Sequence, residues 1–138
     1  MNETIKIIVI DDERAIRDGC HRVLTGKGYE VITAENGQIA LDILDREPLD
    51  IILLDLKMPV IGGEEVLEIT RKKYPDIPVI IITGHGTVDT AVVCMKSGAY
   101  DFITKPFQID QFLLTVTRAA EKRRLEQKAK QFKEENIR

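Results

Sequence analysis

Three uninterrupted runs of four apolar residues constrain the fold of this chain more than any other feature. They lie at residues 7–10, 51–54 and 79–82 and consist of isoleucine, valine and leucine. Strands that are apolar at every position, rather than at alternate positions, are buried on both faces, as in a parallel sheet with helices on both sides. Each run is also far shorter than the roughly 20 residues that cross a bilayer, so we expect no membrane-spanning segment.

Helical patterns separate these runs. Two weaker strands are predicted at 30–34 and 101–104, and apolar residues recur at spacings of three and four between the strands. Asp110 is expected to cap the last helix at its N-terminus. Strand and helix alternate five times, which predicts a doubly wound α/β domain with five parallel strands and five helices. The expected inward-facing stripes are Ile16, Cys20, Val23, Leu24 and Lys27; Ile39, Ala40, Ile43 and Leu44; Val66, Leu67, Ile69 and Thr70; Val88, Ala91, Val92 and Met95; and Leu113, Val116 and Ala120.

Composition and charge exclude several classes of protein. The 138 residues suit one domain, and with only 5% aromatic residues and no Trp its core should be aliphatic. A net charge of −3 argues against a strongly basic nucleic-acid-binding surface, so we expect this domain to make no direct nucleic-acid contact. Two cysteines are too few for a disulfide framework, and no apolar signal segment follows Met1. These features predict a cytoplasmic protein.

The last 18 residues differ in character from the rest of the chain. In the segment 121–138, seven residues are basic and four are acidic, and no Pro or Gly interrupts it. We therefore expect a domain at 1–120 and a charged helical linker at 121–138 that leads toward an output domain. Leu125, Ala129 and Phe132 form a thin apolar stripe at helical spacing. The stripe leaves open whether the linker is a solvated helix or pairs with a second copy.

Five polar residues fall at the predicted carboxyl ends of four strands. Asp11 and Asp12 follow the first strand, Asp55 follows the third, Thr83 the fourth and Lys105 the fifth. Ligands of open parallel sheets bind outside these strand ends. Each residue alone has an ordinary explanation as a helix cap or a solvated side chain. Their joint placement on one rim indicates a functional site.

Electrostatics indicate that this rim holds a metal ion. Two carboxylates about 4 Å apart repel each other by roughly 1 kcal/mol in water and about 4 kcal/mol near a protein surface. Lys105 supplies one positive charge, which is too little to balance three carboxylates. A hard divalent cation with oxygen ligands relieves the repulsion, and Mg²⁺ typically takes one or two carboxylates together with waters and a phosphate. Acids, a cation, a lysine and a hydroxyl together suit phosphoryl chemistry.

Five motifs occur in a fixed order along the chain. They are Val-Ile-Asp-Asp-Glu at 9–13, Leu-Leu-Asp-Leu-Lys-Met-Pro at 53–59, Gly-Gly at 62–63, Ile-Ile-Thr-Gly at 81–84 and Gly-Ala-Tyr-Asp-Phe-Ile-Thr-Lys-Pro-Phe at 98–107. In this order and at these separations, the chain resembles the receiver domain of two-component response regulators from residue 5 to about residue 120. The resemblance implies a flavodoxin-like sheet with strand order 2-1-3-4-5.

The resemblance also implies roles for the acidic residues. Asp55 matches the aspartate that accepts a phosphoryl group from a phosphohistidine on a sensor histidine kinase. Asp11 and Asp12 match the acidic pair that holds Mg²⁺, and the backbone carbonyl of Lys57 matches a further ligand. Asp55 completes the implied metal site.

Three further positions match the switching residues of the family. Lys105 matches the lysine that pairs with a phosphoryl oxygen, and its bond to Pro106 is cis in such proteins. Thr83 matches the hydroxyl that moves toward the phosphoryl group. Phe102 matches the aromatic residue whose rotamer follows that movement. The resemblance thus implies a switch in the face made by the fourth helix, fifth strand and fifth helix.

The stretch Thr-Gly-His-Gly at 83–86 and the charged linker narrow the resemblance further. They are similar to receivers of sigma-54-dependent (NtrC-like) transcription activators. The implied protein is a signalling switch rather than an enzyme, and it assists only its own phosphorylation and dephosphorylation. Its expected partners are a sensor histidine kinase and a second copy, bound through the switching face or the C-terminal helix.

Two other functions share this architecture and stay open as alternatives. A flavodoxin-like module that binds a small molecule, such as flavin, needs a glycine- and hydroxyl-rich loop after the first strand, where this chain has Asp11, Asp12 and Glu13. A Mg²⁺-dependent aspartyl phosphatase carries a second acid two residues after its nucleophile, where this chain has Lys57. The P-loop pattern of nucleotide enzymes does not occur in the sequence.

Overall fold

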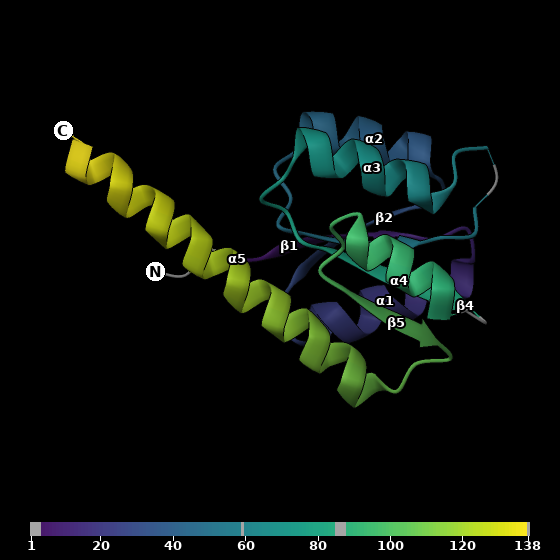
Figure 1. The fold of residues 1–138 in the computed structure, drawn as a ribbon. Coiled ribbons are helices and arrows are strands. Elements are labelled where there is room, and N and C mark those ends of the chain that lie inside the picture. The colour runs from purple at the N-terminus through teal and green to yellow at the C-terminus, as the bar shows by residue number, and fades with distance from the viewer. Residues whose placement is uncertain (1–3, 59, 85–87, 138) are drawn as a thin grey trace.

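A five-stranded parallel sheet forms the centre of the protein (Figure 1). The computed structural model describes residues 4–58, 60–84 and 88–137. The strand order is β2-β1-β3-β4-β5, which confirms the predicted topology. The three apolar runs form the three central strands, where both faces are covered. The strands are β1 (Lys6–Ile10), β2 (Glu30–Ala34), β3 (Ile51–Asp55), β4 (Val79–Gly84) and β5 (Asp101–Lys105).

Five helices cover the two faces of this sheet. Helices α2, α3 and α4 lie on one face and helices α1 and α5 on the other (Figure 1). Asn36 caps α2, since its side-chain oxygen accepts a hydrogen bond from the backbone N–H of Ile39 at 2.9 Å. The helices are α1 (Arg14–Gly26), α2 (Gly37–Arg46), α3 (Gly63–Lys73), α4 (Val88–Lys96) and α5 (Ile109–Ile137).

Alternate residues of the central strands point into two separate apolar cores. In β3, Ile52 and Leu54 belong to the core under α2, α3 and α4, while Ile51 and Leu53 belong to the core under α1 and α5. All four are fully buried. This arrangement explains why the strand is apolar at every position, because neither face can carry a solvated side chain.

The structure corrects three details of the predicted helices. Lys27 and Ile39, both expected on inward-facing stripes, are exposed, and Lys27 lies just beyond the end of α1. Helix α5 begins at Ile109, so Asp110 lies in its first turn and is not its N-cap, although its negative charge still favours that end of the helix. In α4, Val92 and Met95 are exposed, whereas Ala91 and Cys94 are buried. Apolar residues occupy most sides of α4 itself, so their spacing did not identify which side of the helix packs on the sheet.

Helix α5 continues through residue 120 without a break. The long tail of this helix extends away from the sheet (Figure 1). Its apolar core-facing residues end at Ala120. Within the described part of the chain, no helix combines the length and hydropathy needed to cross a membrane.

Candidate functional site

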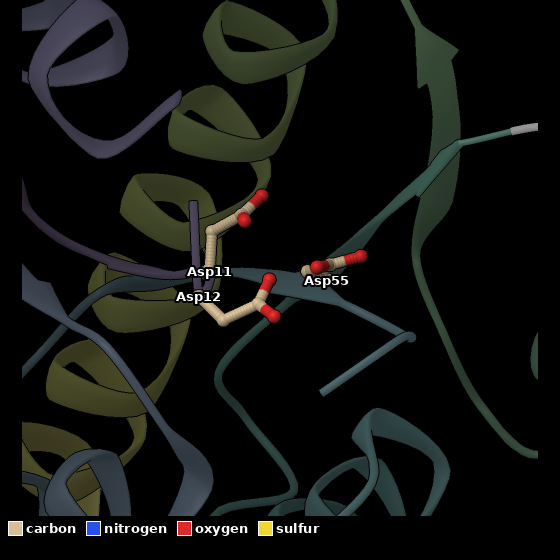
Figure 2. A group of neighbouring side chains, drawn as sticks. All are labelled: Asp11, Asp12 and Asp55. Carbon is tan, nitrogen blue, oxygen red and sulfur yellow. The ribbon is translucent and has the colours of Figure 1, made fainter. Parts of the chain in front are cut away.

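The sheet brings three predicted acidic residues together at its carboxyl edge. Asp11 and Asp12 directly follow β1, and Asp55 is the last residue of the neighbouring strand β3. One carboxylate oxygen from each residue lies within 4.8 Å of the others, and Figure 2 shows the three side chains facing one space. Asp11 and Asp55 are buried, while Asp12 is exposed to solvent. The cluster is therefore a partly enclosed group of oxygen ligands of the kind that binds a hard cation.

Lys105 joins this cluster from the end of β5. Its Nζ lies 2.8 Å from Asp11 Oδ2, 3.2 Å from Glu13 Oε1 and 3.7 Å from Asp55 Oδ2. Its side chain is only 12% exposed, and the Lys105–Pro106 bond is cis, as the resemblance implied. One ammonium is thus shared among three carboxylates, and the site keeps an excess of negative charge.

Burial and this excess charge together shift the pKa of Asp55. Burial, followed by the negative charge of Asp11, raises the pKa of Asp55 from its usual 3.8 to about 6. Lys105 and the backbone N–H of Lys57, which donates to Asp55 Oδ1 at 3.2 Å, oppose this rise without cancelling it. Burial lowers the pKa of Lys105, but the hydrogen bond and charge of Asp11 outweigh burial, and the pKa of Lys105 lies above its usual value.

Without a bound cation, the Asp55 carboxylate is expected to destabilise the fold at neutral pH. The pKa of Asp55 is higher in the folded protein than in the unfolded chain. Protonated Asp55 therefore contributes its full share to the free energy of unfolding below about pH 4, and this contribution is lost as the pH rises through about 6. Asp55→Asn should therefore raise the free energy of unfolding by about 1–3 kcal/mol near pH 8 and by little near pH 4. Urea unfolding in the presence of a chelator measures both values. Equal gains at the two pH values would contradict this origin of the effect.

A small cavity opens beside the acidic cluster. Its volume is about 270 Å³, and Asp12, Asp55, Lys57 and Lys105 contribute to its wall. The position of Lys57 on this wall is compatible with its predicted role, in which its backbone carbonyl is a metal ligand. The space is large enough for a hydrated cation and a phosphoryl group beside the Asp55 carboxylate.

Thr83 and Phe102 occupy different surroundings. Thr83 lies in β4 and is buried, and among the described residues its Oγ1 has no hydrogen-bond partner. A buried hydroxyl without a partner is unfavourable and can gain free energy from a new acceptor. Phe102 lies in β5, which is an edge strand of the sheet, and is 41% exposed. The switching roles of both residues remain predictions. His85, the histidine of the Thr-Gly-His-Gly motif at 83–86, lies outside the described residues.

Two further residues position the site, although the sequence analysis assigned them no role. Arg17, in the second turn of α1, donates from Nη1 to the backbone carbonyl of Asp11 at 2.9 Å. Gly63, at the start of α3, donates its N–H to the carbonyl of Leu56 at 3.1 Å. A Cβ atom on Gly63 would lie 2.3 Å from the carbonyl oxygen of Asp55. The pair of glycines at 62–63 was the only sequence signal for this close approach.

Comparison with known proteins reveals a family that matches most of the chain. Residues 7–117 match the response regulator receiver domain. A protein of Rickettsia conorii named "Putative response regulator NtrX-like" is 43% identical over 119 residues, which is 85% of this chain and 25% of that protein. The "DNA-binding transcriptional regulator NtrC" of Escherichia coli is 39% identical over 111 residues, covering 80% of this chain and 24% of that protein. The chain thus spans about a quarter of the length of these relatives.

Solved structures give the same result. The crystal structure of the receiver domain of NtrX from Brucella abortus has a TM-score of 0.78 and is 41% identical, covering 83% of this chain and 98% of that one. A longer NtrX structure from the same organism has a TM-score of 0.87 at 35% identity, covering 93% of this chain and 30% of that one. Both similarities combine the fold with clear sequence identity.

Proposed function

Because the chain belongs to the response regulator receiver domain family, we propose that Asp55 accepts a phosphoryl group from the phosphohistidine of a sensor histidine kinase. The observation that supports this proposal most is the meeting of Asp11, Asp12 and Asp55 with the Lys105 ammonium at one edge of the sheet. A carboxylate attacks a phosphoryl group poorly because both are anionic. Nearby positive charge lowers that repulsion.

We infer that the acidic cluster binds Mg²⁺. Its ligands would be the carboxylates of Asp11, Asp12 and Asp55 and the backbone carbonyl of Lys57. Oxygen donors at this spacing suit the cation, and the pKa of Asp55 is raised by burial and then by the uncompensated negative charge of Asp11. Bound Mg²⁺ would supply charge neutralisation for the carboxylates and the incoming phosphoryl group.

Lys105 and Thr83 are proposed to hold the phosphoryl group after transfer. Lys105 already lies 3.7 Å from Asp55 Oδ2, so its ammonium needs only a small movement to reach a phosphoryl oxygen. The buried hydroxyl of Thr83 is an available donor. A phosphoryl group adds about −1.5 to −2 charges, and charge-assisted hydrogen bonds from these two residues would draw β4 and β5 toward Asp55. Phe102 would then turn into the space that Thr83 leaves.

We propose that the switch acts through the face formed by α4, β5 and α5. Val92 and Met95 on α4 and Phe102 on β5 expose apolar surface there. A second copy of the chain that packs on this face would bury those side chains. A change in Phe102 would alter the shape of the same surface and hence the affinity for the second copy.

Incubation of the protein with acetyl phosphate and Mg²⁺ tests these proposals together. Intact-mass measurement should show the addition of one phosphoryl group, and a chelator should abolish it. Sedimentation of the labelled sample should show a shift toward dimers. Failure of labelling with Mg²⁺ present would refute the phosphoacceptor role, whereas normal labelling without any change in sedimentation would refute only dimerisation through this face.

The family match and the residues of the site favour the receiver function over the two alternatives. The loop after β1 carries carboxylates where a flavin phosphate would need neutral donors, and the phosphatase position two residues after Asp55 carries Lys57. We therefore propose a signalling switch whose only chemistry is its own phosphorylation and dephosphorylation. Hydrolysis of small phosphate esters with repeated turnover would contradict this.

For the longer protein, we propose transcription control in the cytoplasm. The relatives named NtrX and NtrC are about four times as long as the matched segment, and the Escherichia coli relative is a DNA-binding transcriptional regulator. The receiver domain, 1–120, would then act through a helical linker, 121–138, on an output domain that activates sigma-54-dependent transcription. The receiver itself would make no direct nucleic-acid contact. An ATPase P-loop encoded after Arg138 would support this proposal, and a stop codon there would contradict it.

A further inference from the structure

On the face of α5 that contacts the domain, the side chains change from apolar to polar after Ala120. Phe112, Val116 and Ala120 are fully buried and are spaced four residues apart. The next positions on the same face, at spacings of three and four, are Arg123 and Gln127. Polar contacts therefore replace apolar ones where the helix begins to leave the domain.

The carboxylate of Asp50 accepts hydrogen bonds from both of these side chains. Arg123 Nε lies 3.2 Å from Asp50 Oδ1, and Gln127 Nε2 lies 3.4 Å from the same oxygen. The side chains of Asp50 and Arg123 are each only 17% exposed, so water screens this pair less than an ion pair on the open surface. Arg123 also donates from Nη1 to the backbone carbonyl of Asp76 at 3.2 Å. One arginine thus bridges two separate loops of the domain.

The sheet holds Asp50 rigidly in place. Its other carboxylate oxygen, Oδ2, accepts the backbone N–H of Lys6 at 2.9 Å, and its own N–H donates to the carbonyl of Lys6 at 2.8 Å. Asp50 directly precedes β3, whose last residue is Asp55. The two aspartates lie at opposite ends of one strand, about 16 Å apart at about 3.3 Å per residue.

Apolar burial contributes little to holding the segment 121–133. Leu125 is 67% exposed and Phe132 is 64% exposed. A cavity of about 570 Å³ lies between this part of α5 and the loop at Asp76, so the helix does not pack closely on the domain there. Isolated helical segments of this length are marginal in water. The contacts of Asp50 therefore attach this part of α5 to the sheet, together with the Arg123–Asp76 hydrogen bond and the half-buried side chain of Arg124.

We propose that Asp50 is a positioning residue that clamps Arg123 and Gln127 and so fixes the direction in which α5 leaves the domain. The charged segment after Ala120 then behaves as a continuation of the domain rather than as a frayed end. If the proposed function holds, the clamp sets the orientation of the output domain, and a shift of α5 on phosphorylation is carried along the same helix. That consequence rests on the proposed function, whereas the clamp does not.

Hydrogen exchange of the 138-residue protein, without Mg²⁺ or phosphoryl donor, tests the clamp. Asp50→Asn removes the charge but keeps an acceptor for Lys6, and Arg123→Ala leaves β1 and β3 untouched. Both variants should increase amide exchange in residues 124–133 by about tenfold, the effect of losing one charge-assisted hydrogen bond. Alanine favours helix, so the intrinsic propensity change in Arg123→Ala opposes the expected effect.

Lys122→Ala is the matched control. Lys122 forms an ion pair with Glu126 on the exposed side of the same helix, so its loss should change exchange by less than about threefold. The double variant with Asp50→Asn and Arg123→Ala should exchange no faster than Arg123→Ala alone, because Arg123→Ala already removes the partner of the Asp50 charge. Exchange in both clamp variants equal to that of Lys122→Ala, or multiplicative effects in the double variant, would overturn the proposal. Since no phosphorylation is involved, such a failure is separate from any failure of Asp55 to be labelled.

Discussion

Asp55→Asn is expected to abolish labelling by acetyl phosphate in the presence of Mg²⁺. The amide lacks the anionic oxygen that attacks phosphorus, and it removes one member of the acidic cluster. The other carboxylates of the cluster should not substitute, because Asp11 is fully buried and pairs with Lys105 at 2.8 Å, and Asp12 is exposed to solvent and has no described ion pair. Intact-mass measurement should show only unmodified protein for this variant, against full addition of one phosphoryl group to the original chain.

Asp18→Asn is the matched control for this experiment. Asp18 is an exposed aspartate of α1 that forms an ion pair with Arg14 on the same helix, at 3.5 Å. This variant should be labelled as fully as the unmodified sequence. The phosphoryl group should also be released by hydroxylamine, which cleaves acyl phosphates by attack at the acyl carbon. Full labelling of Asp55→Asn, or a label that resists hydroxylamine, would show that another residue is the acceptor.

Gly63→Ala is expected to destabilise the protein by about 2–3 kcal/mol, the upper part of the usual range for overpacked sites. The added Cβ would lie 2.3 Å from the carbonyl oxygen of Asp55 and 2.6 Å from the Cα of Leu56. Both are backbone atoms, so no flexible side chain can move aside, and α3 must shift away from the end of β3. Urea unfolding monitored by circular dichroism measures the loss. The same shift should slow labelling of Asp55.

The adjacent glycine provides the control for the effect of Gly63. A Cβ on Gly62 would meet nothing within 4 Å, and its φ of −72° is open to any residue. Gly62→Ala should therefore change stability by less than about 1 kcal/mol, with stabilisation as the direction expected from lower chain entropy in the unfolded state. Equal losses in the two variants would mean that the close approach of Gly63 to β3 is not the cause.

Local sequence patterns were sufficient to predict the sheet and most residues of the site. A strand such as β3 must be apolar on both faces to lie between two layers of helices, so its sequence alone predicts its environment. Polar residues at the ends of such strands must then gather on one edge, so the sequence alone predicts that Asp11, Asp55 and Lys105 meet there, as they do in the structure. The individual roles of these residues came from the family resemblance.

Other features depended on contacts between distant parts of the chain. The apolar residues of α4 allowed more than one buried face, and only packing against the sheet selected Ala91 and Cys94 over Val92 and Met95. The raised pKa of Asp55 depends on burial and on distances to other charges, which no sequence spacing specifies.

The sequence by itself determined the order of strands and helices and the edge at which the acidic residues meet, because alternation and periodicity are local consequences of burial. Only the tertiary structure decided that Lys105 is shared by three carboxylates and that Asp50 holds Arg123, 73 residues away. Hydrogen bonds and ion pairs act over about 3 Å. Which side chains come that close is set by the packing of whole elements, and neither residue of such a pair indicates its partner in the sequence.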